Sequence, residues 1–301
     1  MKLGMIGLGR MGANMAQRLL KGGHDVIGFD PDSAARRDSV GQGMVTVDSL
    51  TALINALPAP RTLWLMVPSG KPTETTLSTL LTLLSDEDTV VDGGNSNYKD
   101  TLRRAEEFTK KKIHYIDCGT SGGIWGLTEG YSMMIGGDKQ AIESMRPVFE
   151  TLAPAPDKGW GQVGNYGAGH FSKMIHNGIE YGLMQAYAEG FSILQHKTEF
   201  AFDLHQVANI WRHGSVVRSW LLDLTAAALA DNPSMTGIAP YVEDSGEGRW
   251  TVLEALDLDI STPVITLSLL ERLRSREADS FSAKLLAAMR QQFGGHTVKP
   301  E

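Results

Sequence analysis

Cysteine is almost absent from this chain, which has one among 301 residues. A single thiol excludes an internal disulfide and fits a reducing compartment, so we expect a cytoplasmic protein. That thiol, Cys118, ends the apolar run Ile113–Cys118, which favours a strand position over a nucleophile. No apolar run approaches the ~20 residues of a membrane span. The first apolar segment reads as a strand that leads straight into a glycine motif, so we expect neither a signal peptide nor a membrane partner.

Basic residues are also scarce, with 28 Lys and Arg against 35 Asp and Glu and a formal net charge of −7. This deficit argues against nucleic acid as a partner. An anionic small molecule remains compatible if its basic contacts are concentrated locally. The histidines are scattered, and Asp257 and Asp259 look like loop residues, so we expect no metal site.

Glycine, in contrast, is abundant, and its first cluster has the context of a dinucleotide site. An apolar strand, Lys2–Ile6, leads into Gly7-Leu8-Gly9-Arg10-Met11-Gly12, which opens a helix ending near Gly22. A second strand, Asp25–Phe29, ends in Asp30, about twenty residues past the motif. The glycines let the backbone approach a pyrophosphate, and the helix N-terminus supplies free N–H groups to hold it. A tight structural turn is the alternative, which the surrounding strands and helix disfavour.

Asp30 predicts which dinucleotide binds. A carboxylate there accepts both ribose hydroxyls of NAD but repels the 2′-phosphate of NADP. At ~4 Å and an effective dielectric constant of ~20, one unit of like charge costs about 4 kcal/mol before screening. A third of that favours NAD about tenfold. Arg36 and Arg37 could soften this exclusion, although they could also be ordinary surface residues, so we expect NAD with some use of NADP.

Strands and helices continue to alternate as far as Cys118. The further predicted strands are Arg61–Val67, Thr89–Asp92 and Ile113–Cys118, and the predicted helices are Thr73–Leu84 and Tyr98–Lys112. The pattern predicts an α/β fold with a Rossmann-type, doubly wound parallel sheet. Ligands bind at the carboxyl ends of such strands, so we expect contacts from the loops Val67-Pro68-Ser69, Gly93-Gly94-Asn95 and Gly119-Thr120-Ser121-Gly122-Gly123. Each loop could instead be a simple turn.

The second half of the chain reads as helical. A strand, Ser132–Ile135, and a helix, Lys139–Leu152, precede the glycine-rich boundary Gly159–Gly169. The helices predicted beyond it are Phe171–Gln195, Leu204–Arg212, Arg218–Ala230, Thr251–Leu258, Val264–Arg274 and Ser280–Phe293. We therefore predict a dinucleotide-binding domain over 1–166 and an all-α substrate and oligomerisation domain over 167–301.

Chemically active side chains gather on one face of the first of these helices. Their spacing follows a 3.6-residue period: Lys173, Asn177, Glu180, Tyr181 and Met184, with His176 beside them. For any single one of them, an ordinary solvated face is the alternative. The remaining faces are apolar or small, through Phe171, Ile175, Ile179, Leu183 and Ala186, so we expect the helix to lie deep in a domain. Burial lowers the pKa of a lysine and raises the pKa of a carboxyl group, which suits Lys173 as a base and Glu180 as an acid.

Cations gather late in the chain. Arg272, Arg274 and Arg276 end one predicted helix, and Arg290 and His296 lie near the C-terminus. The ordinary reading is a favourable interaction with the helix dipole. A phosphate, however, needs charge-assisted donors, and arginine is the usual source.

Three motifs resemble the 6-phosphogluconate dehydrogenase family, in the short form whose helical domain is not duplicated. They are Asp92-Gly93-Gly94-Asn95-Ser96, then Gly119–Gly123 followed by Gly130-Tyr131-Ser132-Met133-Met134-Ile135-Gly136-Gly137, and finally Lys173-Met174-Ile175-His176-Asn177-Gly178-Ile179-Glu180-Tyr181. The wider β-hydroxyacid dehydrogenase superfamily shares the first glycine motif and the Lys…Asn pair, but does not usually carry His-Asn-Gly-Ile-Glu-Tyr. The resemblance covers essentially the whole chain.

The resemblance implies oxidative decarboxylation of 6-phosphogluconate to ribulose 5-phosphate, in the pentose phosphate pathway. Lys173 would take the proton of the C3 hydroxyl and then stabilise the enolate oxygen, which makes a metal unnecessary, and Glu180 would protonate C1 of the enediol. The sugar acid would be held by Asn95, Ser121, Gly122, Gly123, His176 and Asn177, and its phosphate by Tyr181 and Arg272. Arg290 and His296 match a tail that enters a neighbouring subunit's site, which implies a homodimer or homotetramer.

Two departures from the family pattern stand out. Where many members have Asn-Arg-Thr for NADP, this chain has Asp30-Pro31-Asp32, in agreement with NAD. Where longer members carry a lysine-bearing loop near the phosphate, it has Ser245-Gly246-Glu247-Gly248-Arg249-Trp250. Two alternatives stay open: a non-decarboxylating β-hydroxyacid dehydrogenase that needs none of the late cations, and a non-catalytic dinucleotide-binding regulator in which Lys173 and Glu180 are dispensable.

Overall fold

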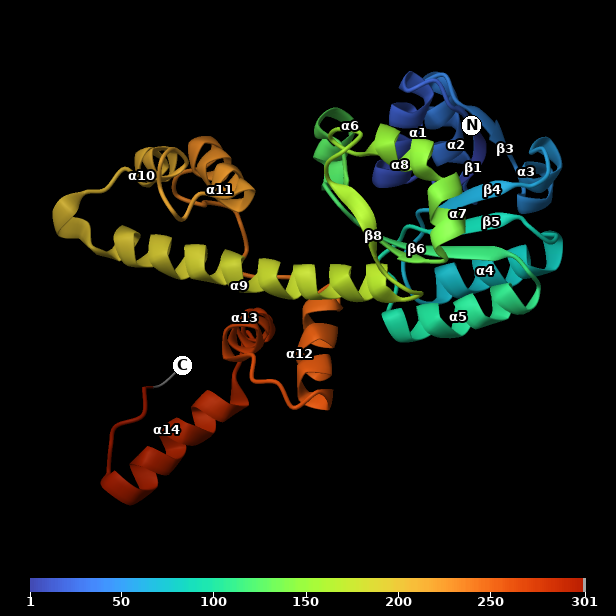
Figure 1. The fold of residues 1–301 in the computed structure, drawn as a ribbon. Coiled ribbons are helices and arrows are strands. Elements are labelled where there is room, and N and C mark those ends of the chain that lie inside the picture. The colour runs from blue at the N-terminus through green and yellow to red at the C-terminus, as the bar shows by residue number, and fades with distance from the viewer. Residues whose placement is uncertain (300–301) are drawn as a thin grey trace. The chain divides into compact units, whose positions relative to one another are not determined.

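The computed structural model describes residues 1–299, and the chain forms two compact units, residues 1–177 and residues from Gly178 onward. Helix α9 (Ala168–His196) belongs to both (Figure 1). The units divide inside this helix, whereas the boundary predicted from the sequence, 166/167, lies just before it. Residues 300 and 301, which end the predicted second domain, lie outside the described residues.

The first unit contains an eight-stranded sheet with the order β3-β2-β1-β4-β5-β6-β7-β8. Its strands are β1 (Lys2–Ile6), β2 (Asp25–Phe29), β3 (Val45–Val47), β4 (Thr62–Leu65), β5 (Thr89–Asp92), β6 (His114–Ser121), β7 (Ser132–Gly137) and β8 (Trp160–Gly164). Strands β1 to β6 are parallel, which confirms the predicted Rossmann-type sheet. Strand β7 is antiparallel to β6, with Ser121 paired to Ser132, and β8 is parallel to β7. The order reverses between β1 and β4, which places the ligand crevice at their carboxyl ends.

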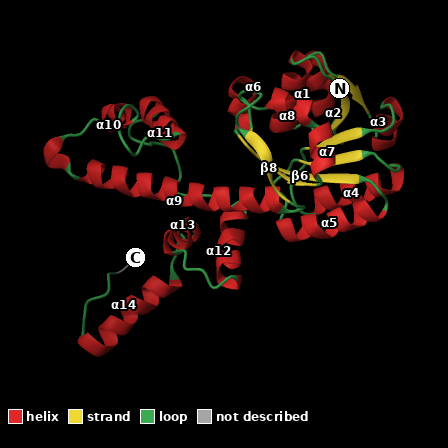
Figure 2. Ribbon diagram, in the orientation of Figure 1, coloured by secondary structure: helices red, strands yellow, loops and turns green. Residues whose placement is uncertain are grey.

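Helices cover both faces of this sheet (Figure 2). They are α1 (Arg10–Lys21), α2 (Ser33–Gly41), α3 (Leu50–Ala56), α4 (Lys71–Leu83), α5 (Tyr98–Lys110), η1 (Gly123–Trp125), α6 (Gly126–Glu129), α7 (Lys139–Ser144) and α8 (Arg146–Leu152). One buried cluster joins α1, α7 and α8 to the sheet, and a second joins α3, α4 and α5 to it. The single helix predicted over Lys139–Leu152 is two helices that meet at Met145, because Pro147 lacks the N–H that a continuous helix needs.

The second unit is helical in its described residues, as predicted. After α9 come η2 (Thr198–Phe200), α10 (Leu204–Trp211), α11 (Trp220–Asp231), α12 (Glu247–Asp257), α13 (Pro263–Arg274) and α14 (Phe281–Gly294). A small buried cluster surrounds Phe191 and Leu222. Helix α9 was expected to lie deep in a domain. This is wrong for the part of the helix that belongs to the second unit, because Ile179 is 52% and Leu183 45% exposed in the single chain.

Candidate active site

The glycine motif forms the turn between β1 and α1. Gly7 has a φ of +92°, and a Cβ atom on Gly12 would lie 1.9 Å from the carbonyl oxygen of Gly7, so only glycine allows strand and helix to approach this closely. A Cβ atom on Gly9 would meet open space. No side chain caps α1, and its first turn holds no acidic residue. The N–H groups in the first turn of α1 can therefore bind an anion, which fits the pyrophosphate of a dinucleotide.

Asp30 ties the end of β2 to this loop. Its Oδ2 atom accepts a hydrogen bond from the N–H of Leu8 at 2.8 Å, and its Oδ1 atom accepts one from the N–H of Asp32 at 2.8 Å. Each carboxylate oxygen keeps a further lone pair that can accept from a ribose hydroxyl. The Nη1 atom of Arg36 donates to the carbonyl oxygen of Asp30 at 2.6 Å, so a guanidinium lies beside the same turn.

The loops after β4 and β5 lie against the glycine motif. A Cβ atom on Gly7 would lie 3.0 Å from the Cγ1 atom of Val67, and one on Gly94 would lie 2.9 Å from the carbonyl oxygen of Val67. The Thr73 hydroxyl donates to the carbonyl oxygen of Pro68 at 2.8 Å, which fixes the loop that continues to Ser69. Asn95 follows Gly94 and is exposed. The structure thus brings the predicted cofactor residues to one edge of the sheet.

Lys173 lies in the second turn of α9, against the end of β6. The residue is 6% exposed, and its Nζ atom donates to the Oδ1 atom of Asn177 at 2.7 Å. The Nδ1 atom of His176 lies 3.5 Å from the Lys173 amine and 3.0 Å from the same Asn177 oxygen. A Cβ atom on Gly119 would lie 2.4 Å from the Cβ atom of Lys173. The residues Gly119 to Ser121, which were expected in a loop, are therefore the last residues of β6, packed against α9, and Gly122 and Gly123 follow them.

Two buried residues that the sequence analysis missed hold the start of α9. Asp117 accepts hydrogen bonds from the N–H groups of Gly167 at 2.8 Å and His170 at 3.0 Å. The ring of His170 lies 2.7 Å from the Thr101 hydroxyl and 3.1 Å from the carbonyl oxygen of Asp92. A signal was present, because a carboxylate inside the apolar run Ile113–Cys118 must find donors if it is buried.

In the second unit, the two residues predicted to bind phosphate contact each other. The guanidinium carbon of Arg272 lies 3.5 Å from the centroid of the Tyr181 ring, within the range of a cation–π interaction. The Tyr181 hydroxyl pairs with the Ser245 hydroxyl at 3.2 Å, which in turn donates to the Oε2 atom of Glu247 at 2.5 Å. Of the segment Ser245–Trp250, which was expected to be a loop, Glu247–Trp250 forms the first turn of α12, and Ser245 ties the start of this helix to Tyr181.

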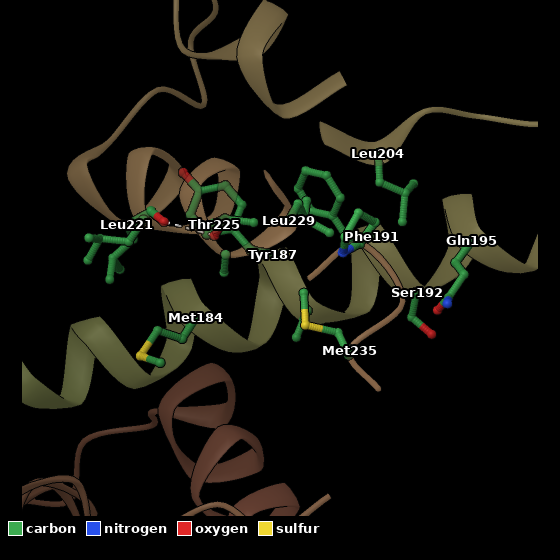
Figure 3. Close-up of a pocket in the computed structure, with 14 residues that line it drawn as sticks. Met184, Tyr187, Phe191, Ser192, Gln195, Leu204, Leu221, Thr225, Leu229 and Met235 are labelled. Carbon is green, nitrogen blue, oxygen red and sulfur yellow. Dashed lines mark hydrogen bonds between the residues drawn. The ribbon is translucent and has the colours of Figure 1, made fainter. Parts of the chain in front are cut away.

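The remaining predicted residues lie elsewhere in the second unit. Glu180 is partly buried, one residue before Tyr181 on α9, and Arg290 and His296 are exposed within and just after α14. A mostly apolar pocket of about 480 Å³ lies between α9, α10 and α11 (Figure 3). It is lined by side chains such as Met184, Phe191 and Leu221. It has no cluster of acids, bases or cations, so it is not the candidate active site.

Neither a cluster of metal ligands nor a helix that could span a membrane occurs within residues 1–299. No group of three or more His, Cys, Asp or Glu side chains lies close enough together to hold a metal ion. None of the described helices combines the length and the apolar character that crossing a membrane requires.

Comparison with known proteins covers almost the whole chain. A family described as the NAD binding domain of 6-phosphogluconate dehydrogenase matches residues 2–164, and one described as the C-terminal domain of that enzyme matches residues 169–280. A putative 6-phosphogluconate dehydrogenase of Bacillus subtilis is 44% identical over 299 residues, which cover 99% of each chain. The protein named 6-phosphogluconate dehydrogenase, NAD(+)-dependent, decarboxylating, of Haloferax volcanii is 43% identical over 299 residues, covering 99% of this chain and 98% of that one.

Two solved structures resemble this chain along most of its length. The 6-phosphogluconate dehydrogenase of Plasmodium falciparum matches with a TM-score of 0.85 at 27% identity, covering 100% of this chain and 66% of that one. A 3-hydroxyisobutyrate dehydrogenase of Mycobacterium tuberculosis matches with a TM-score of 0.72 at 20% identity, over 89% of this chain and 90% of that one, and shares the fold.

Proposed function

Because the chain belongs to the 6-phosphogluconate dehydrogenase family, as its sequence predicted, we propose that it catalyses the NAD-dependent oxidative decarboxylation of 6-phosphogluconate to ribulose 5-phosphate and carbon dioxide. The same proposal places it in the cytoplasm and the pentose phosphate pathway. One observation carries it: a buried lysine amine is held by Asn177 at the edge of the sheet where the dinucleotide loop lies. A relative matched over nearly its full length is named for this reaction.

Lys173 is the general base in this proposal. Its Nζ atom accepts the proton of the C3 hydroxyl. NAD, when bound, would supply the nicotinamide that takes up the hydride from C3. Asn177 fixes the amine at 2.7 Å, which orients it for proton transfer. The protonated amine then stabilises negative charge on the C3 oxygen while the carboxylate of the 3-keto acid leaves as carbon dioxide. Glu180 donates the proton that the carbon left behind, C2 of the substrate and C1 of the resulting enediol, receives in the last step.

The substrate contacts follow the same assignment. Asn95, Ser121, Gly122, Gly123, His176 and Asn177 hold the sugar acid, and Tyr181 and Arg272 hold its phosphate. The stacked position of Arg272 supports this role, because one of its N–H groups is fixed on the carbonyl oxygen of Glu243 at 2.8 Å while the planar guanidinium carries further donors for an anion.

NAD is the preferred cofactor in this proposal, with some use of NADP. Asp30 is held beside the glycine loop by the N–H of Leu8, where it favours ribose hydroxyls and repels a 2′-phosphate. The guanidinium of Arg36 donates to the carbonyl oxygen of Asp30 and supplies a partly compensating positive charge. The carboxylate accepts a hydrogen bond directly from the loop, and we expect it to decide the preference.

We further propose a homodimer or homotetramer with shared sites. Helix α14 has exposed side chains at nearly every described position, including Phe281 at 74% and Leu286 at 58%. Arg290 and His296 belong to this segment and would complete the phosphate contacts of a neighbouring subunit. Mixing inactive Lys173→Met subunits with inactive His296→Ala subunits should then restore part of the activity. Mixed oligomers without any recovery would contradict shared sites.

The decisive assay measures cofactor reduction and carbon dioxide release together, with 6-phosphogluconate and either NAD or NADP. We expect faster reduction of NAD, with one carbon dioxide released for each NADH formed. Reduction without carbon dioxide would replace the proposal by a non-decarboxylating β-hydroxyacid dehydrogenase. No reduction with either cofactor would favour another substrate or the non-catalytic regulator, and a titration of NAD binding combined with other β-hydroxyacids would then separate these two alternatives.

A further inference from the structure

We propose that Asp117 and His170 are positioning residues for Lys173: together they fix the first turn of α9 and thereby place the amine of the base. The inference rests on the proposed role of Lys173. Neither residue reaches the substrate in this assignment. Both lie within the first unit, and both are almost completely buried, at 0% and 1% exposure.

The carboxylate of Asp117 has a defined position under the start of α9. It accepts from the N–H of Gly167, the residue before the helix, and from the N–H of His170 in the first turn. These groups have no partner inside the helix, and the positive end of the helix dipole favours a carboxylate there. A Cβ atom on Gly136, the partner of Asp117 in the β6–β7 ladder, would lie 2.6 and 2.7 Å from the carboxylate oxygens. The neighbouring strand therefore leaves room for this carboxylate only because residue 136 is glycine.

The imidazole of His170 ties the same turn to the loop that carries Asn95. Its Nε2 atom faces the carbonyl oxygen of Asp92 at 3.1 Å, and because a carbonyl only accepts, Nε2 carries a proton. Its Nδ1 atom lies 2.7 Å from the Thr101 hydroxyl on α5. The side chain of Asp92 in turn accepts from the hydroxyls of Ser96 at 2.8 Å and Tyr115 at 2.9 Å.

Lys173 follows His170 by three residues, so it stands about one turn further along the same helix. A tilt of the first turn would move the amine relative to Asn95, and a misplacement of about 1 Å can cost on the order of 10²-fold in rate. NAD binding should be affected little, because the glycine loop and Asp30 are held by a separate contact. The expected signature is a loss of kcat without a matching loss of cofactor affinity.

Asp117→Asn tests this, with Asp88→Asn as its matched control. Asp88 is also fully buried and accepts two backbone N–H groups, from Arg61 at 2.6 Å and Ser85 at 2.9 Å, but it lies at the opposite end of the strands, just before β5. It also pairs with the guanidinium of Arg61 at 3.1 Å, so the control removes at least as much stabilisation as the test variant does. We expect Asp117→Asn to lower kcat about 10- to 100-fold, to keep the Kd for NAD within about threefold of the parent value, and to shift the pH profile of kcat. Asp88→Asn should lower Tm to a similar extent and keep kcat within about twofold.

A milder pair covers the case in which Asp117→Asn does not fold. Thr101 and Thr151 each donate to the carbonyl oxygen four residues earlier and each face a histidine, His170 and His24 respectively. Thr101→Val should lower kcat roughly three- to tenfold, as a partial displacement of the turn predicts, and Thr151→Val should not.

Equal kcat losses in test and control variants, or a loss of Tm alone in Asp117→Asn and Thr101→Val, would overturn the positioning role while the parent enzyme remains active. A parent protein that does not oxidise 6-phosphogluconate would overturn the proposed function as well. The two failures are therefore distinguished by the parent assay.

Discussion

The two units of the chain differ in how completely they bury their apolar residues. In the first unit, the sheet lies between two buried clusters, and Leu3, Met5 and Leu65 have no exposed surface. In the second, a small cluster forms around Phe191, while Leu256 is 68% and Phe281 74% exposed. The first unit thus completes its own core, and the second presents a surface that water solvates poorly.

This difference matches the tasks proposed for the two units. A base must be held within a fraction of an ångström, and Lys173 lies on the part of α9 that packs against a sheet covered by its own helices. A phosphate clamp can be assembled from two chains, and exposed apolar residues are what a second copy would cover. Four experiments test whether the fixed placement of functional groups in the first unit and the association of chains through the second unit are separate properties.

The largest effect is expected from Lys173→Met. Removing a general base should lower kcat by about 10³-fold, within the range of ~10²–10⁴ for such groups. Binding of NAD, measured by protein fluorescence, and Tm should stay close to the parent values, because Met keeps the apolar stem. Lys139→Met, an exposed lysine at the start of α7, is the control and should turn over normally. If Lys173→Met keeps a kcat close to that of the parent, Lys173 is not the general base.

The next largest effect concerns association. Leu286→Asp places a carboxylate on the exposed apolar side of α14, and burying it unpaired in an interface would cost several kcal/mol. We expect the variant to elute as a smaller species than the parent in size-exclusion chromatography and to lose activity on dilution. Val40→Asp, at a 53% exposed position of α2 in the first unit, should elute and react as the parent does. Identical elution of all three proteins would contradict an interface at α14.

A smaller effect should follow from Asp30→Ala. Without the carboxylate, the ratio of kcat/KM with NAD to that with NADP should fall about tenfold, since roughly 1.4 kcal/mol of discrimination is lost. Asp38→Ala, an exposed acid of the following helix, is the control and should leave the ratio unchanged. If Asp30→Ala also leaves it unchanged, the discrimination lies with other residues.

The smallest effect is expected when the native protein is treated with a thiol reagent, and the quantity measured is the labelling of Cys118. Burial raises the pKa of Cys118 to about 12, so at pH 8 only about 10⁻⁴ of the thiol is ionised, and its reactivity rises with pH. The native protein should resist labelling by a disulfide reagent at pH 8, and the protein in guanidinium chloride should react with one equivalent. Rapid labelling of native protein would mean that the first unit opens more readily than its closed core suggests.

The parts of the fold that could be predicted are those with a local signature. Strands β1, β2 and β5 begin and end where expected, because each is a short apolar run closed by glycine or aspartate. Residues 31–60 yielded no element, yet α2, β3 and α3 form there. Helix α2 buries only Ser39, and β3 is three residues long at the sheet's edge, so both depend on packing that a local pattern does not contain. Strand β8 was likewise hidden in the glycine-rich stretch taken as a boundary.

The residues of the site divide in the same way, into those with a local signature and those that depend on distant packing. Lys173, His176 and Asn177 were expected together and lie together, because helical spacing alone brings them into reach. Asp117 and His170 were missed because their hydrogen bond joins residues 53 positions apart and exists only once β6 lies under α9. Position along a helix is thus readable from sequence, and what holds the helix in place is not.

The reversed direction of β7 has a consequence for how this protein can vary. Because Ser121 and Ser132 are paired, the segment between them leaves the sheet and returns to it at a single edge. A parallel neighbour would have needed a crossover to the far edge, and any change in length would have had to respect it. This segment begins with Gly122 and Gly123, which are proposed to touch the sugar acid. Insertions or exchanges there can alter what the enzyme accepts without rethreading the sheet, so substrate choice can evolve independently of the fold.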